Sequence, residues 1–386
     1  MTDLMKSIRR VVTGRGADGR SSVVMDGPAT NTRAAMGSGR RYTDVWVWEE
    51  VPLSLSEKRD SGDLTYDFPG PPNGGHVRVV HANTPATGFD RTKDPEQIPL
   101  HEPKVSPSGR MWERGGNNAY TSAMHKTETV DYGIQLVGER ILVLDDRELP
   151  MGPGDVVIQV GAFHAWSNPR LSGVMAFDMI GARFVDGQAG LAQGNDMPMA
   201  VAPGWKPPAG VEPVRRIVTI DRKPGISSLV SDGPAPDVRI DPARPGFAST
   251  RLWVTDSTPA KIVFETLHLP HTIEPPRRGT VMRVVTYPPD RTWQGRVGET
   301  EVRAWFAAMG SPNASAYSAR APHPYVQETR TVDFCFVLKG EIVLVLDDDE
   351  VVMRAGDCVV QRGGRHAWSN RSDTPAVVAI ASHDAA

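Results

Sequence analysis

The sequence predicts an all-β protein that contains two copies of one domain, each built as a sandwich or barrel. The stretch Thr127–Asn168 returns at Thr329–Asn370 without a gap, and more than half of the aligned positions are identical. Short runs rich in valine, isoleucine and leucine are separated by turns, for which the chain has 37 glycines and 33 prolines. No long 3.6-residue apolar period is present, and only Glu301–Met309 is expected to form a short helix.

The duplication extends beyond this repeated stretch. Near the start, the strand-like run Ile8–Thr13 leads into a second run, and Val214–Thr219 opens the same pattern past the middle of the chain. His76–Pro85 has a looser counterpart in Val281–Pro289. We therefore interpret the whole chain as a tandem duplication in which each copy has an ordinary domain size.

The duplication predicts three segments. Residues 1–186 form the first domain, residues 187–213 a connector, and residues 214–386 the second domain. The connector is rich in glycine, proline and alanine and lacks a sustained period, so we expect a proline-stiffened linker.

Charge and composition exclude several classes of protein. A net charge of −3 offers no basic surface for nucleic acid. The sequence has no apolar run of about 18 residues that predicts a membrane span, and its first residues lack the apolar core of a signal peptide. Cys335 and Cys358 lie in strand-like runs and are expected to be buried thiols. We therefore expect a cytoplasmic protein whose partner is a small-molecule substrate.

The repeated stretch resembles the central part of the cupin family, small jelly-roll barrels that often hold a metal. The family motifs are Gly-x5-His-x-His-x3-4-Glu-x6-Gly and Gly-x5-Pro-x-Gly-x2-His-x3-Asn. In copy one they fall on His125, Thr127, Asp131 and Gly138, and on Gly154, Gly161, His164 and Asn168. This chain departs from the pattern because threonine replaces the second histidine, aspartate replaces the glutamate, and the proline is absent. The resemblance implies two cupin-like jelly-roll barrels in tandem, a bicupin.

Copy two keeps only part of this residue set. The counterparts of His125, Asp131 and His164 are Gln327, Asp333 and His366. Glutamine is a poor metal ligand, so the principal site is predicted in the first barrel and a secondary candidate site in the second.

The spacing of the residues in copy one points to a metal. Alternate residues of a strand share a face, so His125 and Asp131 are expected to face the barrel interior, where His164 arrives from another strand. Two imidazoles and one carboxylate form the facial arrangement of mononuclear iron enzymes. We predict one divalent ion, iron, manganese or zinc, on these three residues. Cupins of this type include dioxygenases that act on small aromatic or dicarbonyl compounds, which makes an oxidoreductase the leading prediction.

Two alternatives remain open. In a metal-free lyase or isomerase, such as a dehydratase or decarboxylase, His164 and Asp131 would move protons, and Trp166 would form a wall of the catalytic site. A small-molecule-binding bicupin would use the same barrels without catalysis. The resemblance also suggests a homo-oligomer in each case.

Overall fold

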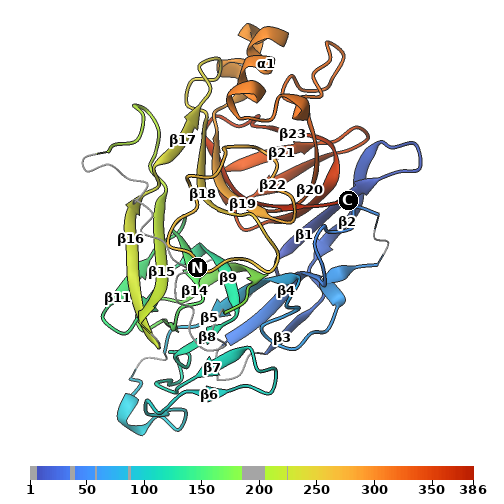
Figure 1. Cartoon of the computed structure of the whole chain (residues 1–386). Helices are drawn as coiled ribbons and strands as arrows, with labels where there is room; N and C mark the ends of the chain where they lie inside the picture. The colour runs from blue at the N-terminus through green and yellow to red at the C-terminus, as the bar shows by residue number, and fades with distance from the viewer. Residues whose placement is uncertain (1–6, 35–39, 57–58, 86–87, 185–204, 224) are drawn as a thin grey trace.

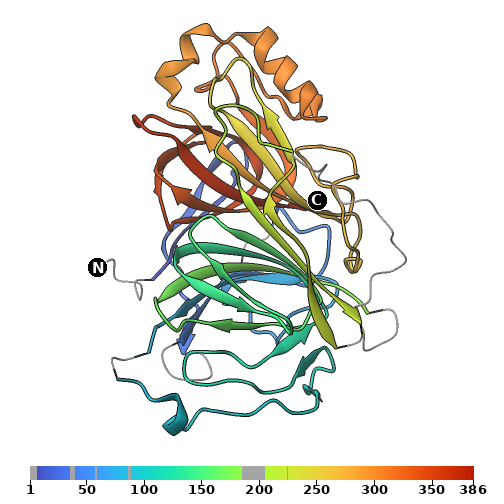
Figure 2. The same ribbon diagram turned by 90° about the vertical axis from the view of Figure 1, so that its left-hand side faces the viewer.

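Two barrels make up the computed structural model of the chain, which describes residues 7–34, 40–56, 59–85, 88–184, 205–223 and 225–386. They stand one against the other, with strands dominating both (Figure 1, Figure 2). Among these residues the helices are α1 (Glu299–Ala308) and short 3-10 turns at Ser61–Asp63, Arg91–Lys93, Asp290–Thr292, Gln294–Arg296 and Pro312–Ala314. The predicted all-β class and the tandem jelly-roll barrels are confirmed.

The first barrel is built on an eight-stranded sheet of order β16-β15-β12-β9-β14-β5-β4-β3. Its strands are β3 (Thr32–Ala34), β4 (Arg40–Trp48), β5 (Gly75–Ala82), β9 (Thr129–Gly138), β12 (Val156–Val160), β14 (Gly173–Gly181), β15 (Arg215–Lys223) and β16 (Ile226–Pro234). Two three-stranded sheets complete it. They contain β10 (Arg140–Val143), β11 (Glu148–Met151) and β13 (Ala165–Ser167), and β6 (Lys104–Val105), β7 (Met111–Glu113) and β8 (His125–Thr127).

The second barrel is built on a ten-stranded sheet whose main path is β17-β18-β19-β24-β20-β23-β1-β2. Its strands are β1 (Arg9–Arg15), β2 (Ser21–Pro28), β17 (Asp237–Ile240), β18 (Ala248–Thr255), β19 (Thr280–Tyr287), β20 (Gln327–Lys339), β21 (Glu341–Val345), β22 (Glu350–Arg354), β23 (Cys358–Ser369) and β24 (Ala376–Asp384). Cys335 and Cys358 are buried free thiols, as predicted.

The two copies exchange their opening hairpins. The hairpin β1–β2 from the start of the chain joins the second barrel, where β1 pairs in parallel with β23. The hairpin β15–β16, which opens copy two, joins the first barrel through parallel pairing of β15 with β12. The predicted boundaries of the three segments stay a prediction. At these two hairpins, each sheet contains strands from both predicted domains. Most of the predicted connector lies outside the described residues.

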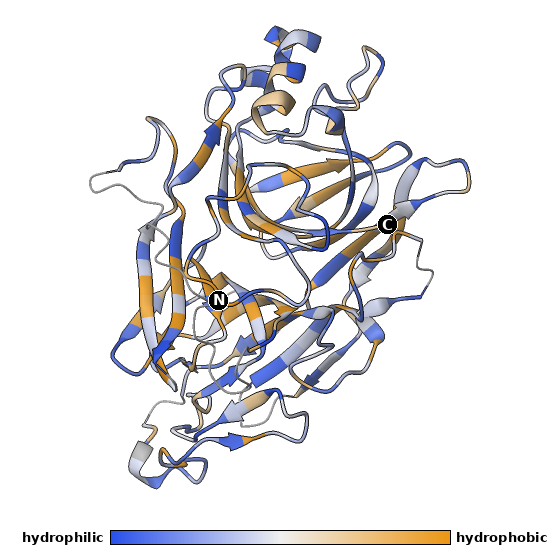
Figure 3. Ribbon diagram, in the orientation of Figure 1, coloured by the Kyte–Doolittle hydropathy of each residue, from blue (hydrophilic) through white to orange (hydrophobic). Residues whose placement is uncertain are grey.

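The large sheets pack against each other along apolar faces. In β9, Tyr132 points to the other barrel and its hydroxyl lies 2.6 Å from Oγ1 of Thr280. His383 and Asp178 also meet between the barrels, with Nε2 and Oδ2 2.8 Å apart and both side chains almost fully buried. Figure 3 shows hydrophobic residues on the central strands and hydrophilic residues on the peripheral loops and hairpins. The other face of β9 is therefore left to line the interior of the first barrel.

A glycine fixes the turn that ends β9. Gly138 has φ +70°, and a Cβ there would lie 1.9 Å from the carbonyl oxygen of Ser172. Gly340 directly follows β20 in the same conformation, with φ +78°. Both positions require a residue without a side chain, which is why the duplicated strand keeps its glycine. No helix in the described ranges is long and apolar enough to span a membrane.

Candidate functional site

A cavity of about 80 Å³ lies inside the first barrel, and the four residues predicted for the principal site all line it. These residues are His125, Asp131, His164 and Trp166. They come from β8, β9 and β13 and from the turn before β13. The strand period of two and the meeting of two chain segments therefore bring them together as the sequence predicts.

The two histidines face each other across a backbone bridge. His125 and His164 exchange two N–H···O bonds of 2.9 Å, and their ring centroids are 4.5 Å apart. Nδ1 of His125 lies 2.8 Å from the carbonyl oxygen of Ala123, and Nδ1 of His164 lies 2.9 Å from that of Ala162. A carbonyl can only accept, so Nδ1 donates in both rings and Nε2 keeps its lone pair. Burial lowers the pKa of both imidazoles, so both are neutral at pH 7.

Asp131 is a buried carboxyl without a full set of partners. Its pKa is raised to about 7, mainly by burial; a hydrogen bond from Thr129 opposes the rise, and the negative charge of Asp178 adds a smaller contribution to it. Its Oδ1 has no hydrogen-bond partner among the described residues. Gln159 stands beside it in the β9–β12 register, and neither of its amide atoms has a partner there either. The polar floor of the cavity is thus prepared for a bound molecule or ordered water.

Three arginines also line this cavity, and the sequence prediction missed them. Arg78 is neutralised by Asp44, with Nε 2.8 Å from Oδ1. Arg140 has no carboxylate within ion-pair distance in the described part of the chain, and neither has Arg40. Burial, followed by the positive charge of Arg40, lowers the pKa of Arg140 to about 9. The cavity therefore holds excess positive charge.

This environment does not fit the predicted metal. Within the described ranges, no three histidine, cysteine or carboxylate side chains gather at a spacing that could hold an ion. His125, Asp131 and His164 share a cavity without converging on one point. The guanidinium groups of Arg40 and Arg140 would also repel a divalent cation in a space this small. A bound metal stays a prediction without support from this geometry.

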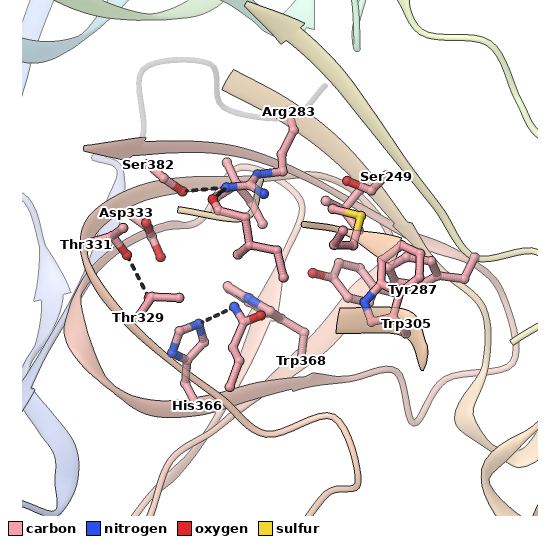
Figure 4. Close-up of a pocket in the computed structure, with 16 residues that line it drawn as sticks. Ser249, Arg283, Tyr287, Trp305, Thr329, Thr331, Asp333, His366, Trp368 and Ser382 are labelled. Carbon is pink, nitrogen blue, oxygen red and sulfur yellow. Dashed lines mark hydrogen bonds between the residues drawn. The ribbon is translucent and has the colours of Figure 1, made fainter. Parts of the chain in front are cut away.

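The second barrel contains a smaller cavity of about 60 Å³, which the secondary candidates Gln327, Asp333 and His366 line. Figure 4 shows Asp333 and His366 in this cavity. Nε2 of Gln327 lies 2.9 Å from Nε2 of His366. Nδ1 of His366 lies 3.1 Å from the carbonyl oxygen of Gly364. Both ring nitrogens of His366 are therefore hydrogen-bonded. The amide of Gln327 donates to Nε2 of His366, whereas the lone pair on Nε2 of His164 in the first barrel remains available. Asp333 keeps an Oδ1 without a partner among the described residues.

Comparing the copies shows which side chains are particular to the first cavity. The gapless repeat aligns Arg140 with Ile342. Val80 and Val285 are equivalent positions of the repeat, and their strand partners are Tyr42 and Ser249. Tyr42 and Ser249 are therefore equivalent as well. Two residues before them stand Arg40 and Phe247, which correspond to each other. Both unpaired arginines thus have apolar counterparts. A charged residue of one copy opposite a buried apolar residue of the other is the sequence signal that could have identified them.

The family comparison agrees with the fold. Residues 318–382 match the family model described as "Cupin domain". Together with the barrel fold, this match supports a cupin-type enzyme or binding protein and specifies no activity. The chain carries a cupin domain in its second copy, and the predicted cupin resemblance is confirmed.

Curated relatives match only short stretches. Phomopsin biosynthesis cluster protein C' of Diaporthe leptostromiformis is 48% identical over 50 residues, which are 13% of this chain and 26% of the relative. Oryzines biosynthesis cluster protein J of Aspergillus oryzae is 44% identical over 52 residues, 13% of this chain and 29% of the relative. The aligned stretch therefore spans little more than a quarter of these relatives.

Solved structures resemble the chain more broadly but distantly. A putative glyoxylate induced protein from Pseudomonas aeruginosa has a TM-score of 0.38 and 12% identity, covering 91% of this chain and 82% of its own. A variant of oxalate decarboxylase from Bacillus subtilis has a TM-score of 0.36 and 11% identity, covering 93% and 76%. Likenesses of this strength carry no information about chemistry.

Proposed function

We propose that the first barrel is a metal-independent acid–base enzyme of the lyase or isomerase class that acts on a small organic molecule. The observation that carries this proposal is Asp131, a carboxyl with a pKa of about 7 and a free Oδ1, in one cavity with two neutral imidazoles. A group whose pKa lies near the working pH is efficient both as a base and as an acid. Buried groups with strongly shifted pKa values are typical of functional sites.

The roles follow from the protonation states. In its carboxylate form Asp131 removes a proton from a substrate carbon, and the electron pair of that C–H bond forms a new double bond to the neighbouring carbon. At that neighbour, either the π pair of an existing double bond shifts to its far atom or the bond to a hydroxyl group breaks. The same carboxyl then delivers the proton to a second atom of the substrate. Delivery to another carbon gives an isomer, and delivery to a departing hydroxyl releases water. Nε2 of His164 and of His125 accept hydrogen bonds from substrate hydroxyl groups, and Trp166 forms an apolar wall.

Deuterium incorporation tests this proposal without a known substrate. The protein would be incubated in D₂O with a panel of small hydroxy, carbonyl and unsaturated compounds, both charged and neutral, and carbon-bound protons would be followed by NMR. We expect exchange or turnover that survives a chelator and falls about 100-fold or more in Asp131→Asn. A rate lost on chelation and restored by one divalent metal contradicts the proposal. So does a rate lost in Asp333→Asn and kept in Asp131→Asn, because it places the chemistry in the second barrel.

The metal-dependent oxidoreductase is the second candidate. The observation that favours it is the anchoring of both Nδ1 atoms on carbonyl oxygens, which is how metal-binding histidines are commonly oriented. The missing third ligand and the unpaired arginines weigh against it. Metal analysis of protein purified without chelator separates the two: a stoichiometric metal that is lost in His125→Ala favours this candidate.

A further inference from the structure

We propose that the cavity of the first barrel binds a small organic anion, a carboxylate, through Arg140 and Arg40. This rests on the proposed function only for the location of the site. It names the class of molecule that the same cavity takes, whether or not that molecule is turned over.

The first step is the isolation of Arg140. Its side chain is buried, with 2% of its surface exposed. Nε donates to Oδ1 of Asn168 at 3.2 Å, and the guanidinium carbon lies 5.0 Å from the ring centroid of Trp166. Nη1 is buried without a hydrogen-bond partner among the described residues. A buried charge normally has a partner of opposite sign, and none is provided by this part of the chain.

The second step is that the fold does not need this charge. Ile342 holds the same place in the second barrel and is fully buried. Phe247 likewise holds the place of Arg40 and lines the second cavity. The same strands thus close around apolar side chains in one copy and around two arginines in the other. The charge in the first copy is therefore a property of its cavity.

The third step is that no carboxylate of the described residues forms an ion pair with Arg140. The carboxyl groups around the cavity are Asp131 in its lining, Asp44 beside Arg78, and Glu96, whose charge acts on Arg40. Asp44 is shared between Arg78 and Arg33. Asp131, whose pKa is raised to about 7 mainly by burial, is only about half ionised near pH 7. Arg40 contributes a further cation: its Nη2 donates to the carbonyl oxygen of Asn118 at 3.4 Å, and the charge of Glu96 offsets it in part. An anion from outside supplies what these residues lack.

The guanidinium groups, the volume and the lining of the cavity together favour a small carboxylate. Guanidinium groups bind planar oxyanions with two parallel N–H···O bonds, which a carboxylate matches. About 80 Å³ admits only a small molecule. Opposite the polar floor, the wall is apolar and aromatic and consists of Tyr42, Phe68, Val80, Trp166, Phe177 and Met179. A short carboxylate with an apolar or unsaturated tail fits both the charge and the walls.

Equilibrium binding tests the assignment. Calorimetry and saturation-transfer NMR would compare pyruvate, acrylate and acetate with the matching neutral amides and with inorganic phosphate. We expect at least one carboxylate to bind, its amide to bind at least about tenfold more weakly, and Arg140→Ile to weaken carboxylate binding by about tenfold or more. Arg140→Lys keeps the charge without the planar fork and should lie between wild type and Arg140→Ile. Arg40→Phe, which takes its residue from copy two, provides a second variant if Arg140→Ile does not fold.

Several results would overturn the proposal. They are amides binding as tightly as acids, both arginine variants binding like wild type, or phosphate binding as tightly as every carboxylate. Absence of binding by all three acids at 10 mM, on the order of the weakest useful affinity, has the same effect. Asp131→Asn separates this proposal from the proposed function: anion binding without turnover in that variant supports both. Turnover of neutral compounds alone, with no anion binding, rejects this inference and leaves the enzyme proposal standing.

Discussion

The stability of Arg140→Ile is the sharpest consequence of an unpaired charge inside the first barrel. Burial lowers the pKa of Arg140 from its ordinary value to about 9. A lowering of that size corresponds to roughly 5 kcal/mol of unfavourable free energy for the buried cation. The variant loses the hydrogen bond to Asn168 and the contact with the ring of Trp166, each about 1 kcal/mol. We therefore expect the variant to be more stable by about 2–3 kcal/mol at pH 7.

The sign follows from the two protonation states. The folded pKa lies below the unfolded one, so the unfolded state binds more protons above about pH 9, and wild-type stability rises with pH there. At pH 7 the guanidinium is charged in both states and the full penalty is present. Urea unfolding of both proteins at pH 7 measures the difference, with an unchanged slope showing that the folded state is comparable.

The reciprocal change in the second barrel is a matched control. Ile342→Arg places the same cation in the equivalent strand and should lower the free energy of unfolding by a few kcal/mol. A carboxylate at a fixed concentration above its wild-type Kd should raise the wild-type midpoint by more than that of Arg140→Ile. The reasoning is refuted if Arg140→Ile is less stable than wild type by 2 kcal/mol or more, on the order of a lost structural ion pair.

Three further changes test other features. Because the folded pKa of Asp131 is raised to about 7, wild type should lose up to roughly 4 kcal/mol relative to Asp131→Asn between pH 4 and pH 8; parallel urea midpoints across that range contradict this. His383→Ala leaves Asp178 buried without its partner and should destabilise the protein by about 3–5 kcal/mol, with a smaller loss when Asp178→Asn is added. Gly133→Ala places a Cβ 2.8 Å from Cγ1 of Val157 and should lower the unfolding free energy by about 1–3 kcal/mol, which an unchanged midpoint would disprove.

The lining of the candidate site was largely predictable because it depends on local periodicity. A strand period of two places Asp131 on the interior face of β9, and the adjacent Thr127 and Thr129 hydroxyls meet at 2.6 Å on that side. The repeat of the His-Ala-Trp-Ser-Asn stretch located His164 and Trp166. Their convergence needed only two strands of one barrel.

The electrostatics of the site were not predictable by the same means. The family motifs specify metal ligands, and arginine is not a metal ligand. The motifs therefore gave no reason to assign Arg140 to the site. The duplication held the necessary information, because Ile342 shows that the position is buried. The sequence also did not predict which barrel each opening hairpin joins. The two hairpins have nearly the same sequence, and pairing Arg10 with Cys358 depends on contacts more than three hundred residues apart.

The exchanged hairpins have a consequence for how such a chain could arise. A single copy with this topology would have its hairpin reaching into a neighbour, and it would complete its own large sheet only with the hairpin of that neighbour. Two such units would form a symmetric, mutually interlocked pair. The present chain has that arrangement with its two halves joined in sequence, so fusion would have made permanent an association that a shorter ancestor had to find by collision. With the partner hairpin always present in the same chain, each half can change its cavity without losing the strands that complete its sheet.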